Sequence, residues 1–246
     1  MKKLLFLLFV LFAWQTMSAQ DKDFHSPTNV RTKGWTFEYS LGYGAYQLDD
    51  MKGLQDAMLG LYGLKETDRF PGNITHTFAL GYMTGYHHFG ANLSYLTTGG
   101  RLHRADYSGS YKVDMIMTGY RLGTLYRYYI NTGFSPLRLY LQMSPGVMFS
   151  NLKMEEKVNI HDESQEDSNT LKATGIYVEP TIGASFRITD WLHFSLSGGY
   201  QADFSGTLKY SGQKTQTKAH WDGLRLYASL TFILSNILSN KNISTP

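Results

Sequence analysis

The stretch Trp35-Thr-Phe-Glu-Tyr-Ser-Leu-Gly-Tyr-Gly-Ala45 determines the class of fold to which this chain belongs. Its odd-numbered positions are apolar or aromatic throughout, whereas its even-numbered positions are polar or small. Successive side chains of a β-strand lie on opposite faces, so this alternation predicts a strand with one apolar and one polar face. The stretch also has the length of roughly 9–11 residues that a tilted strand needs to cross a bilayer.

The same alternation recurs along most of the chain. It is clear over 136–150, 174–188 and 224–232, and it is weaker over about 74–87, 89–98, 112–130 and 191–204. Together with the stretch at Trp35–Ala45, these segments predict eight strands, each near or above the length of a bilayer-crossing strand.

The connections between these strands alternate in length. The short ones are His87-His88, Asn131–Pro136 and Thr189-Asp190, and the long polar ones are 47–73, 99–111, 151–172 and 205–222. Short periplasmic turns and long outer loops are typical of outer-membrane barrels. The sequence therefore predicts an all-β fold, an eight-stranded antiparallel up-and-down transmembrane β-barrel with both ends of the mature chain in the periplasm.

Composition separates this prediction from soluble alternatives. Charged residues make up only 17% of the chain, most of them lie in the long loops, and there is no Cys. A soluble β-sandwich or lipocalin-like barrel turns its apolar face inward and carries Lys, Glu and Asp outside. Here the polar face is mainly Gly, Ser, Thr and Tyr, which suits a narrow lumen. The net charge of +3 is too small for a nucleic-acid-binding protein.

The first twenty residues predict export. Lys2 and Lys3 precede the apolar run Leu4–Trp14, and small residues follow. This arrangement is typical of a secretory signal peptide over 1–20, cleaved near Ala19 or Gln20. We then expect a periplasmic segment over 21–33, the barrel over 34–233 and a tail over 234–246, in a Gram-negative outer membrane. Aromatic residues at the strand ends favour the headgroup zones, namely Trp35, Tyr126, Tyr128, Trp191 and, near the far rim, Tyr107 or Tyr111.

The signal, the eight alternating strands and the alternation of short turns with long loops together resemble the small outer-membrane β-barrel family of the OmpA/OmpX membrane-domain type. The resemblance covers about residues 34–233 and is architectural, without a catalytic motif. It implies a last strand that ends in an aromatic residue, and Gly223–Phe232 resembles that strand. Because residues follow Phe232, either a tail enters the periplasm or the last strand lies elsewhere.

The inward phase of the predicted strands carries charged side chains that are expected to form a polar network in the lumen. These residues are Glu38, Arg121, Arg127, Arg138, Glu179, Arg187, Asp203 and Arg225, together with His193. Unpaired charge away from water is costly, so we expect contacts of Glu179 with Arg121 and of Asp203 with Arg225. Eight strands enclose a lumen that side chains can fill, which favours a plug over a gated path.

Two further segments bear on function. His193-Phe-Ser195 resembles the His-x-Ser pair of outer-membrane lipid A deacylases, but its phase places both side chains in the lumen at the periplasmic end. In the first long loop, Leu48, Met51, Leu54, Met58, Leu61 and Tyr62 follow helical spacing. This spacing predicts an amphipathic helix that caps the barrel or lies on the outer leaflet, and extension of the flanking strands is the alternative.

These features favour a non-enzymatic barrel with a structural or surface-interaction role, and they predict no cofactor and no metal site. The alternatives are an outer-leaflet lipid-modifying enzyme of the deacylase kind and a narrow channel. The expected partners are outer-membrane lipid and lipopolysaccharide, with a protein or ligand at the loops 47–73, 99–111, 151–172 and 205–222. Loops 97–112 and 205–222 are basic and loop 151–172 is acidic. Their charges either pair with one another or hold lipid phosphates.

Overall fold

A computed structural model describes residues 33–107, 109–132, 136–160 and 163–234. The predicted signal peptide and nearly all of the predicted terminal segments lie outside these residues. The elements are β1 (Lys33–Tyr46), α2 (Asp49–Tyr62), β2 (Lys65–Arg69), β3 (Asn73–Thr84), β4 (His87–Asp106), β5 (Gly109–Asn131), β6 (Leu137–Ile160), β7 (Glu163–Arg187), β8 (Leu192–Ser205), β9 (Thr207–Tyr210), β10 (Gln213–Lys218) and β11 (Gly223–Ile233). In the described part of the chain, no helix is both long and apolar enough to cross a membrane.

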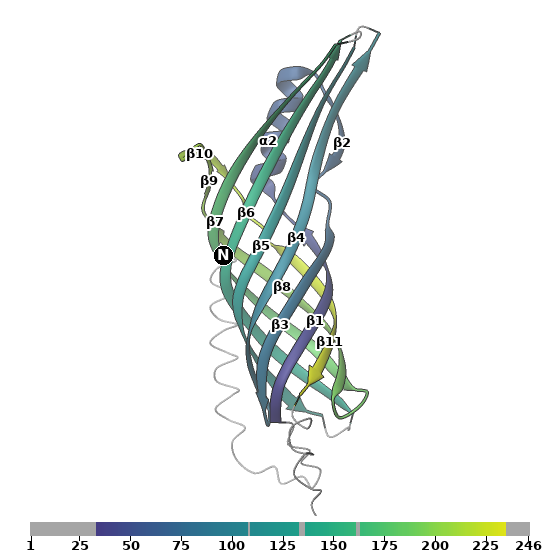
Figure 1. The fold of residues 1–246 in the computed structure, drawn as a ribbon, viewed down its shortest axis with the longest axis vertical. Coiled ribbons are helices and arrows are strands. Elements are labelled where there is room, and N and C mark those ends of the chain that lie inside the picture. The colour runs from purple at the N-terminus through teal and green to yellow at the C-terminus, as the bar shows by residue number, and fades with distance from the viewer. Residues whose placement is uncertain (1–32, 108, 133–135, 161–162, 235–246) are drawn as a thin grey trace, which may run out of the picture. The chain divides into compact units, whose positions relative to one another are not determined.

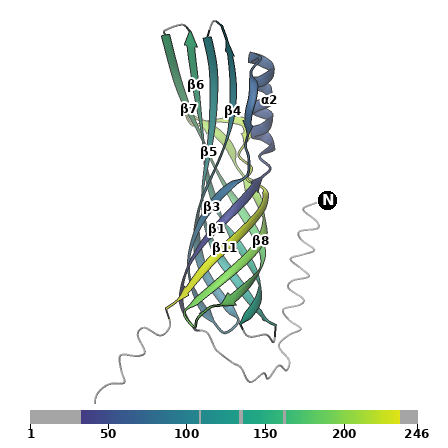
Figure 2. The same ribbon diagram turned by 90° about the vertical axis from the view of Figure 1, so that its right-hand side faces the viewer.

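Eight of the strands close a ring. β1 pairs with β3 and with β11, and antiparallel neighbours run from β3 through β4, β5, β6 and β7 to β8, which pairs with β11. Figure 2 shows this ring, with β1, β11 and β8 side by side. The eight-stranded antiparallel up-and-down barrel is therefore confirmed. Closure leaves the ring without an edge, which is the condition for strands to lie in hydrocarbon.

The two faces of the ring have opposite polarity. On β1 the exposed side chains include Trp35 and Leu41, which are 65% and 45% exposed, whereas Glu38 and Ser40 are buried inside. The other ring strands repeat this arrangement, with exposed aliphatic residues such as Leu80, Ile182 and Leu224 outside. An apolar exterior around a polar interior is stable in lipid and not in water, so the soluble alternatives are excluded.

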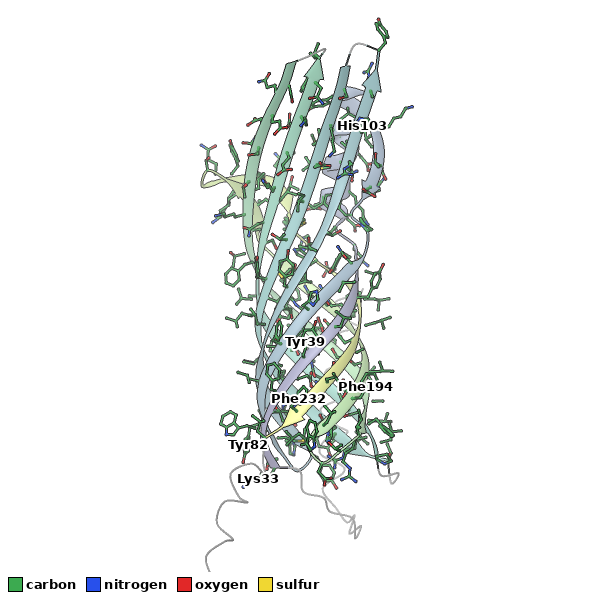
Figure 3. The ribbon with its side chains drawn as sticks, turned by 45° about the vertical axis from the view of Figure 1, so that its right-hand side comes forward. Lys33, Tyr39, Tyr82, His103, Phe194 and Phe232 are labelled. Atoms are coloured by element: carbon green, nitrogen blue, oxygen red, sulfur yellow. The ribbon has the colours of Figure 1, made fainter. Side chains whose placement is uncertain are left out.

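Aromatic side chains form two belts around the ring. At the end with the short turns, Trp35 packs against Tyr82 with ring centroids 5.5 Å apart, and Trp191 stacks on Phe232 at 6.1 Å (Figure 3). The belt at the other end includes Tyr43, Tyr95, Tyr120 and Phe149, of which Tyr95 and Tyr120 lie 5.3 Å apart. The prediction of a far-rim position for Tyr107 was wrong, because this residue lies at the tip of the β4–β5 hairpin, well beyond the belt.

Four ring strands continue far past the second belt. β4 to β7 keep pairing up to Asp106↔Gly109 and Ile160↔Glu163, and Figure 1 shows them rising above the other ring strands. The prediction of open loops over 99–111 and 151–172 was therefore wrong. These segments carry many charges, but the face opposite Arg101, Asp114 and Lys153 carries the buried apolar residues Leu102, Val113, Met115 and Leu152, so pairing continues in water.

The other two long connections also fold. The predicted helix in the first loop is confirmed as α2, which begins with Asp49 and Asp50 at its positive N-terminal end and ends at Gly63 in the left-handed conformation. The side chains of Leu61 and Tyr62 lie outside those described. The connection after β8 forms the small β9–β10 hairpin.

The observed turns and last strand refine two predictions. The turn between β3 and β4 is Gly85-Tyr86, because Gly85 supplies the positive φ of 61° that the turn requires. His87 and His88 instead begin β4 and face opposite sides of the sheet. The last strand lies where the sequence placed it, since β11 pairs with both β1 and β8.

Candidate functional site: the lumen network and the outer cap

The first layer of the lumen network surrounds Arg127 on β5. Its guanidinium donates two hydrogen bonds of 2.9 Å to Glu38 on β1, three strands away around the ring, and its Nε donates to Gln142 at 2.8 Å. Thr231 donates to the same carboxylate at 2.7 Å. The ring of Tyr140 lies 4.4 Å from the guanidinium carbon, so the cation is held between a carboxylate and an aromatic face.

The second layer surrounds Arg121, which lies six residues from Arg127 on β5, further toward the mouth. Arg121 pairs with Glu179, as the sequence predicted, and it also donates to Gln201 at 2.7 Å. Tyr227 accepts from Arg121 at 3.1 Å and donates to Glu179 at 3.0 Å, so one hydroxyl joins both charges. A cavity of about 30 Å³ lies between the layers of Arg127 and Arg121.

The third layer is formed by Arg225 at the mouth of the ring. Its Nε lies 3.4 Å from Glu179, and its guanidinium faces the ring of Tyr46 at 5.2 Å. The expected ion pair of Arg225 with Asp203 was therefore wrong, because Glu179 is the carboxylate in salt-bridge contact with it. Asp203 instead accepts a hydrogen bond of 2.9 Å from the backbone amide of Trp221.

The predicted network residues divide into two groups. Six of them are buried inside the ring, at 5% exposure or less, namely Glu38, Arg121, Arg127, Glu179, Asp203 and Arg225. Arg138 and Arg187 are only partly buried, near the end of the ring with the short turns. Arg187 lies 3.7 Å from the exposed Asp190.

Sequence reasoning missed the polar and aromatic residues that complete these layers. Tyr227, Gln201 and Gln142 occupy inward-facing positions, so the strand period that identified the charged residues could also have identified them. Trp221 gave no such signal, because it follows β10 outside any strand.

His193 and Ser195 do not form a catalytic pair. Both side chains are buried in the lumen, at 3% and 0% exposure, as their phase predicted. His193 Nε2 and Ser195 Oγ have no hydrogen-bond partner among the described residues. A serine nucleophile needs a base within hydrogen-bond reach and access to its substrate, and this pair has neither.

An apolar core closes the mouth of the ring, and we call it and the elements that enclose it the outer cap. The core combines residues of α2, of the extended strands β4 to β7 and of the segment after β10. Its buried side chains include Leu48, Met51, Met58, Phe70, Leu96, Leu102, Val113, Met115, Met117, Met148, Leu152, Leu208 and Trp221. The helix therefore caps the barrel, which is the first of the two positions that its amphipathic pattern predicted.

Trp221 is the centre of this core. It is fully buried, its ring meets that of Tyr46 edge-on at 4.9 Å, and its Nε1 donates to Ser150 at 2.9 Å. Gly119 faces it, and a Cβ atom there would come within 3.2 Å of the indole. The glycine thus leaves the space that the tryptophan fills.

The outer face of the extended strands carries paired charges. Arg101 and Lys112 contact Asp114 at 2.5 Å and 2.6 Å, Lys153 contacts Glu155 at 2.5 Å, and Lys157 contacts Glu166 at 2.5 Å. Partial burial alone would raise the pKa of Asp114, but the hydrogen bonds from Lys112 and Arg101 outweigh it and lower the pKa below the ordinary 3.8. Two of these contacts, Arg101–Asp114 and Lys157–Glu166, join neighbouring strands where no lipid surrounds the sheet, whereas the other two lie within β5 and within β6.

Asp114→Asn is expected to weaken the outer cap slightly, by up to about 1 kcal/mol, because an exposed ion pair contributes little. Since the folded-state pKa is lowered, the contribution of Asp114 is complete above pH 3.8 and disappears as the pH falls through the folded value. Amide hydrogen exchange of β5 between pH 3 and pH 7 measures this. An equal acid sensitivity of the asparagine variant would contradict it.

Comparisons of the structure find small outer-membrane barrels. Neisserial surface protein A is 12% identical, with 82% of this chain and 97% of that chain covered and a TM-score of 0.39. Ail of Yersinia pestis, solved with the heparin analogue sucrose octasulfate, is 14% identical, with 81% and 99% covered and a TM-score of 0.38. The N-terminal β-barrel domain of Pseudomonas aeruginosa OprF is 15% identical, with 81% and 99% covered and a TM-score of 0.32.

No family model matches the sequence, and no curated protein matches it either. The assignment of the fold therefore rests on the molecule itself. It has a closed ring of eight antiparallel strands, an apolar exterior with two aromatic belts, and a polar, charge-paired interior. By these features the chain has the fold of the small eight-stranded β-barrels of the outer membrane.

Proposed function

We propose that this protein is a non-enzymatic, non-conducting outer-membrane barrel that holds a folded cap on the cell surface for a structural or interaction role. The proposal rests on one observation, which is that successive layers of side chains fill the lumen from the end with the short turns to the mouth. Arg127 and Glu38, then Arg121 and Glu179, then Arg225 span the interior, and the apolar core with Trp221 follows.

The charges of the three layers support a closed lumen. Arg127, Arg121 and Arg225 are balanced by Glu38, Glu179 and Asp203, so the buried part of the interior is close to neutral. An ion that entered would have to displace these short-range pairs, and it would gain no excess of opposite charge in return. A solute would also have to pass the core at the mouth.

The outer cap supports the surface role. An extended sheet, a helix and a hairpin with their own apolar core form a rigid platform instead of four separate loops. Binding sites are commonly carried by such surface segments on a rigid scaffold. The parts of the predicted partner loops that fold into this platform, including α2 and the β4–β5 and β6–β7 hairpins, remain the proposed contact surface.

Planar-bilayer recording of the refolded chain tests the closed lumen. Heat-shifted mobility in a gel first establishes that the barrel is folded, and a refolded general porin serves as the positive control. We expect no resolved current steps, because paired side chains fill the lumen. Reproducible steps whose size changes in Arg121→Ala would contradict the proposal and assign a channel to this lumen.

A further inference from the structure

Three lysines lie side by side on the outer face of the sheet. Lys172 on β7 pairs in register with Lys209 on β9, and Lys209 pairs with Lys214 on β10. Directly paired residues of antiparallel strands share a face, and all three side chains are exposed. Two steps between neighbouring strands place the three within roughly 10 Å of one another. We call these residues the lysine row.

The lysine row stands at the height of the lipid headgroups. Lys172 pairs with Asn151 on β6. Phe149 of the second aromatic belt lies two residues before Asn151, on the same face of that strand. On the lipid side, Ile176 and Phe204 pair with each other and are 59% and 46% exposed. The row therefore lies immediately beyond apolar surface that contacts acyl chains, in the zone where aromatic belts mark the interface.

The charges of the lysine row are uncompensated. Among the residues that the structure describes, none of the three ammonium groups takes part in an ion pair, whereas Lys112, Lys153 and Lys157, farther out on the same sheet, each do. Like charges directly opposite on neighbouring strands destabilise a sheet. An anion shared by the three would remove this repulsion, and phosphate suits it because Lys binds phosphate as a mobile point charge.

We propose that Lys172, Lys209 and Lys214 bind the phosphate groups of a phosphorylated glycolipid in the outer leaflet, with its acyl chains on Ile176 and Phe204. The site rests on the position of the ring in the membrane and not on the closed lumen. A conducting barrel would therefore leave this inference intact.

The test measures how much lipid A remains on the barrel. The refolded chain is placed in phosphatidylcholine nanodiscs that contain diphosphoryl lipid A, and the lipid that co-purifies with it in detergent is counted by mass spectrometry. The variant Lys172→Gln/Lys209→Gln/Lys214→Gln is compared with Lys112→Gln/Lys153→Gln/Lys157→Gln, which loses the same charge from the ion-paired part of the same sheet. Heat-shifted mobility confirms folding of each protein.

We expect the lysine-row variant to retain at least about tenfold less lipid A than the wild type, because each lost ammonium removes a charge-assisted contact. The matched variant should stay within about twofold, since its lysines already have partners. Dephosphorylated lipid A should not be enriched on the wild type, and inorganic phosphate should not displace the bound lipid.

Several outcomes would overturn the inference. Equal retention by the lysine-row variant and the wild type would show that the row does not hold the lipid. An equal loss in both triple variants would assign retention to net charge alone. Displacement by inorganic phosphate at millimolar concentration would make the row a site for free anions, and retention of dephosphorylated lipid A would make the apolar surface the only determinant.

Discussion

Replacement of Arg127 by methionine should destabilise the barrel by about 3–5 kcal/mol, the cost of leaving a buried carboxylate without its partner. Glu38 receives two hydrogen bonds from Arg127 and is 5% exposed, so water does not reach it readily once the guanidinium is gone. Reversible urea unfolding of the barrel in lipid vesicles, followed by tryptophan fluorescence, measures the change.

The double variant Glu38→Gln/Arg127→Met separates loss of the pair from loss of packing. We expect it to recover much of the stability, because it removes the uncompensated charge and leaves side chains of similar volume. The hydrogen bond from Thr231 can still be accepted by the glutamine oxygen. If the single and double variants were equally unstable, packing around Tyr140 would account for the effect and the ion pair would not.

Trp221→Ala should open the outer cap while the ring stays folded. Removal of a fully buried indole typically costs about 3–5 kcal/mol, through lost burial and the cavity that remains. The loss falls on the β9–β10 hairpin and α2, because Trp221 joins them to the mouth. Trypsin should then cleave rapidly at Lys209, Lys214 and Lys218, while the heat-shifted gel band of the barrel persists.

Trp221→Phe provides the control for this experiment. Phenylalanine retains most of the contact with Tyr46 but cannot donate the 2.9 Å hydrogen bond to Ser150. We expect cleavage at a rate between those of the wild type and the alanine variant. Wild-type resistance to trypsin in Trp221→Ala would show that the cap does not depend on this side chain.

The strands that the sequence predicted well are those that cross the membrane. Lipid demands an apolar face, and a narrow lumen demands a polar one, so β1 and β11 show strict alternation and were placed within about two residues of their observed bounds. The Arg121–Glu179 contact could be predicted because both side chains lie in the inward phase at the same depth.

Prediction failed where the surroundings change along a single strand. On β5 the inward side chains pass from Arg127 and Arg121 to Met117, Met115 and Val113, because outside the membrane the inner face meets the cap and no longer the polar lumen. The alternation continues but its polarity reverses. A search for one constant apolar phase therefore ended β4, β6 and β7 at the belt and assigned their continuations to loops, whereas the weaker pattern over 112–130 already covered most of β5.

The sequence by itself determined the class of the molecule. A period of two with apolar residues on one face and polar residues on the other is a local property, and it fixes strands, their number and which side chains enter the lumen. Only the tertiary structure decided which carboxylate Arg225 meets, how α2 and Trp221 close the mouth, and that Lys172 joins the lysines of the β9–β10 hairpin in one row. These contacts are between residues of different elements. Which residues meet depends on the register and tilt of the strands, and a local sequence pattern does not determine either.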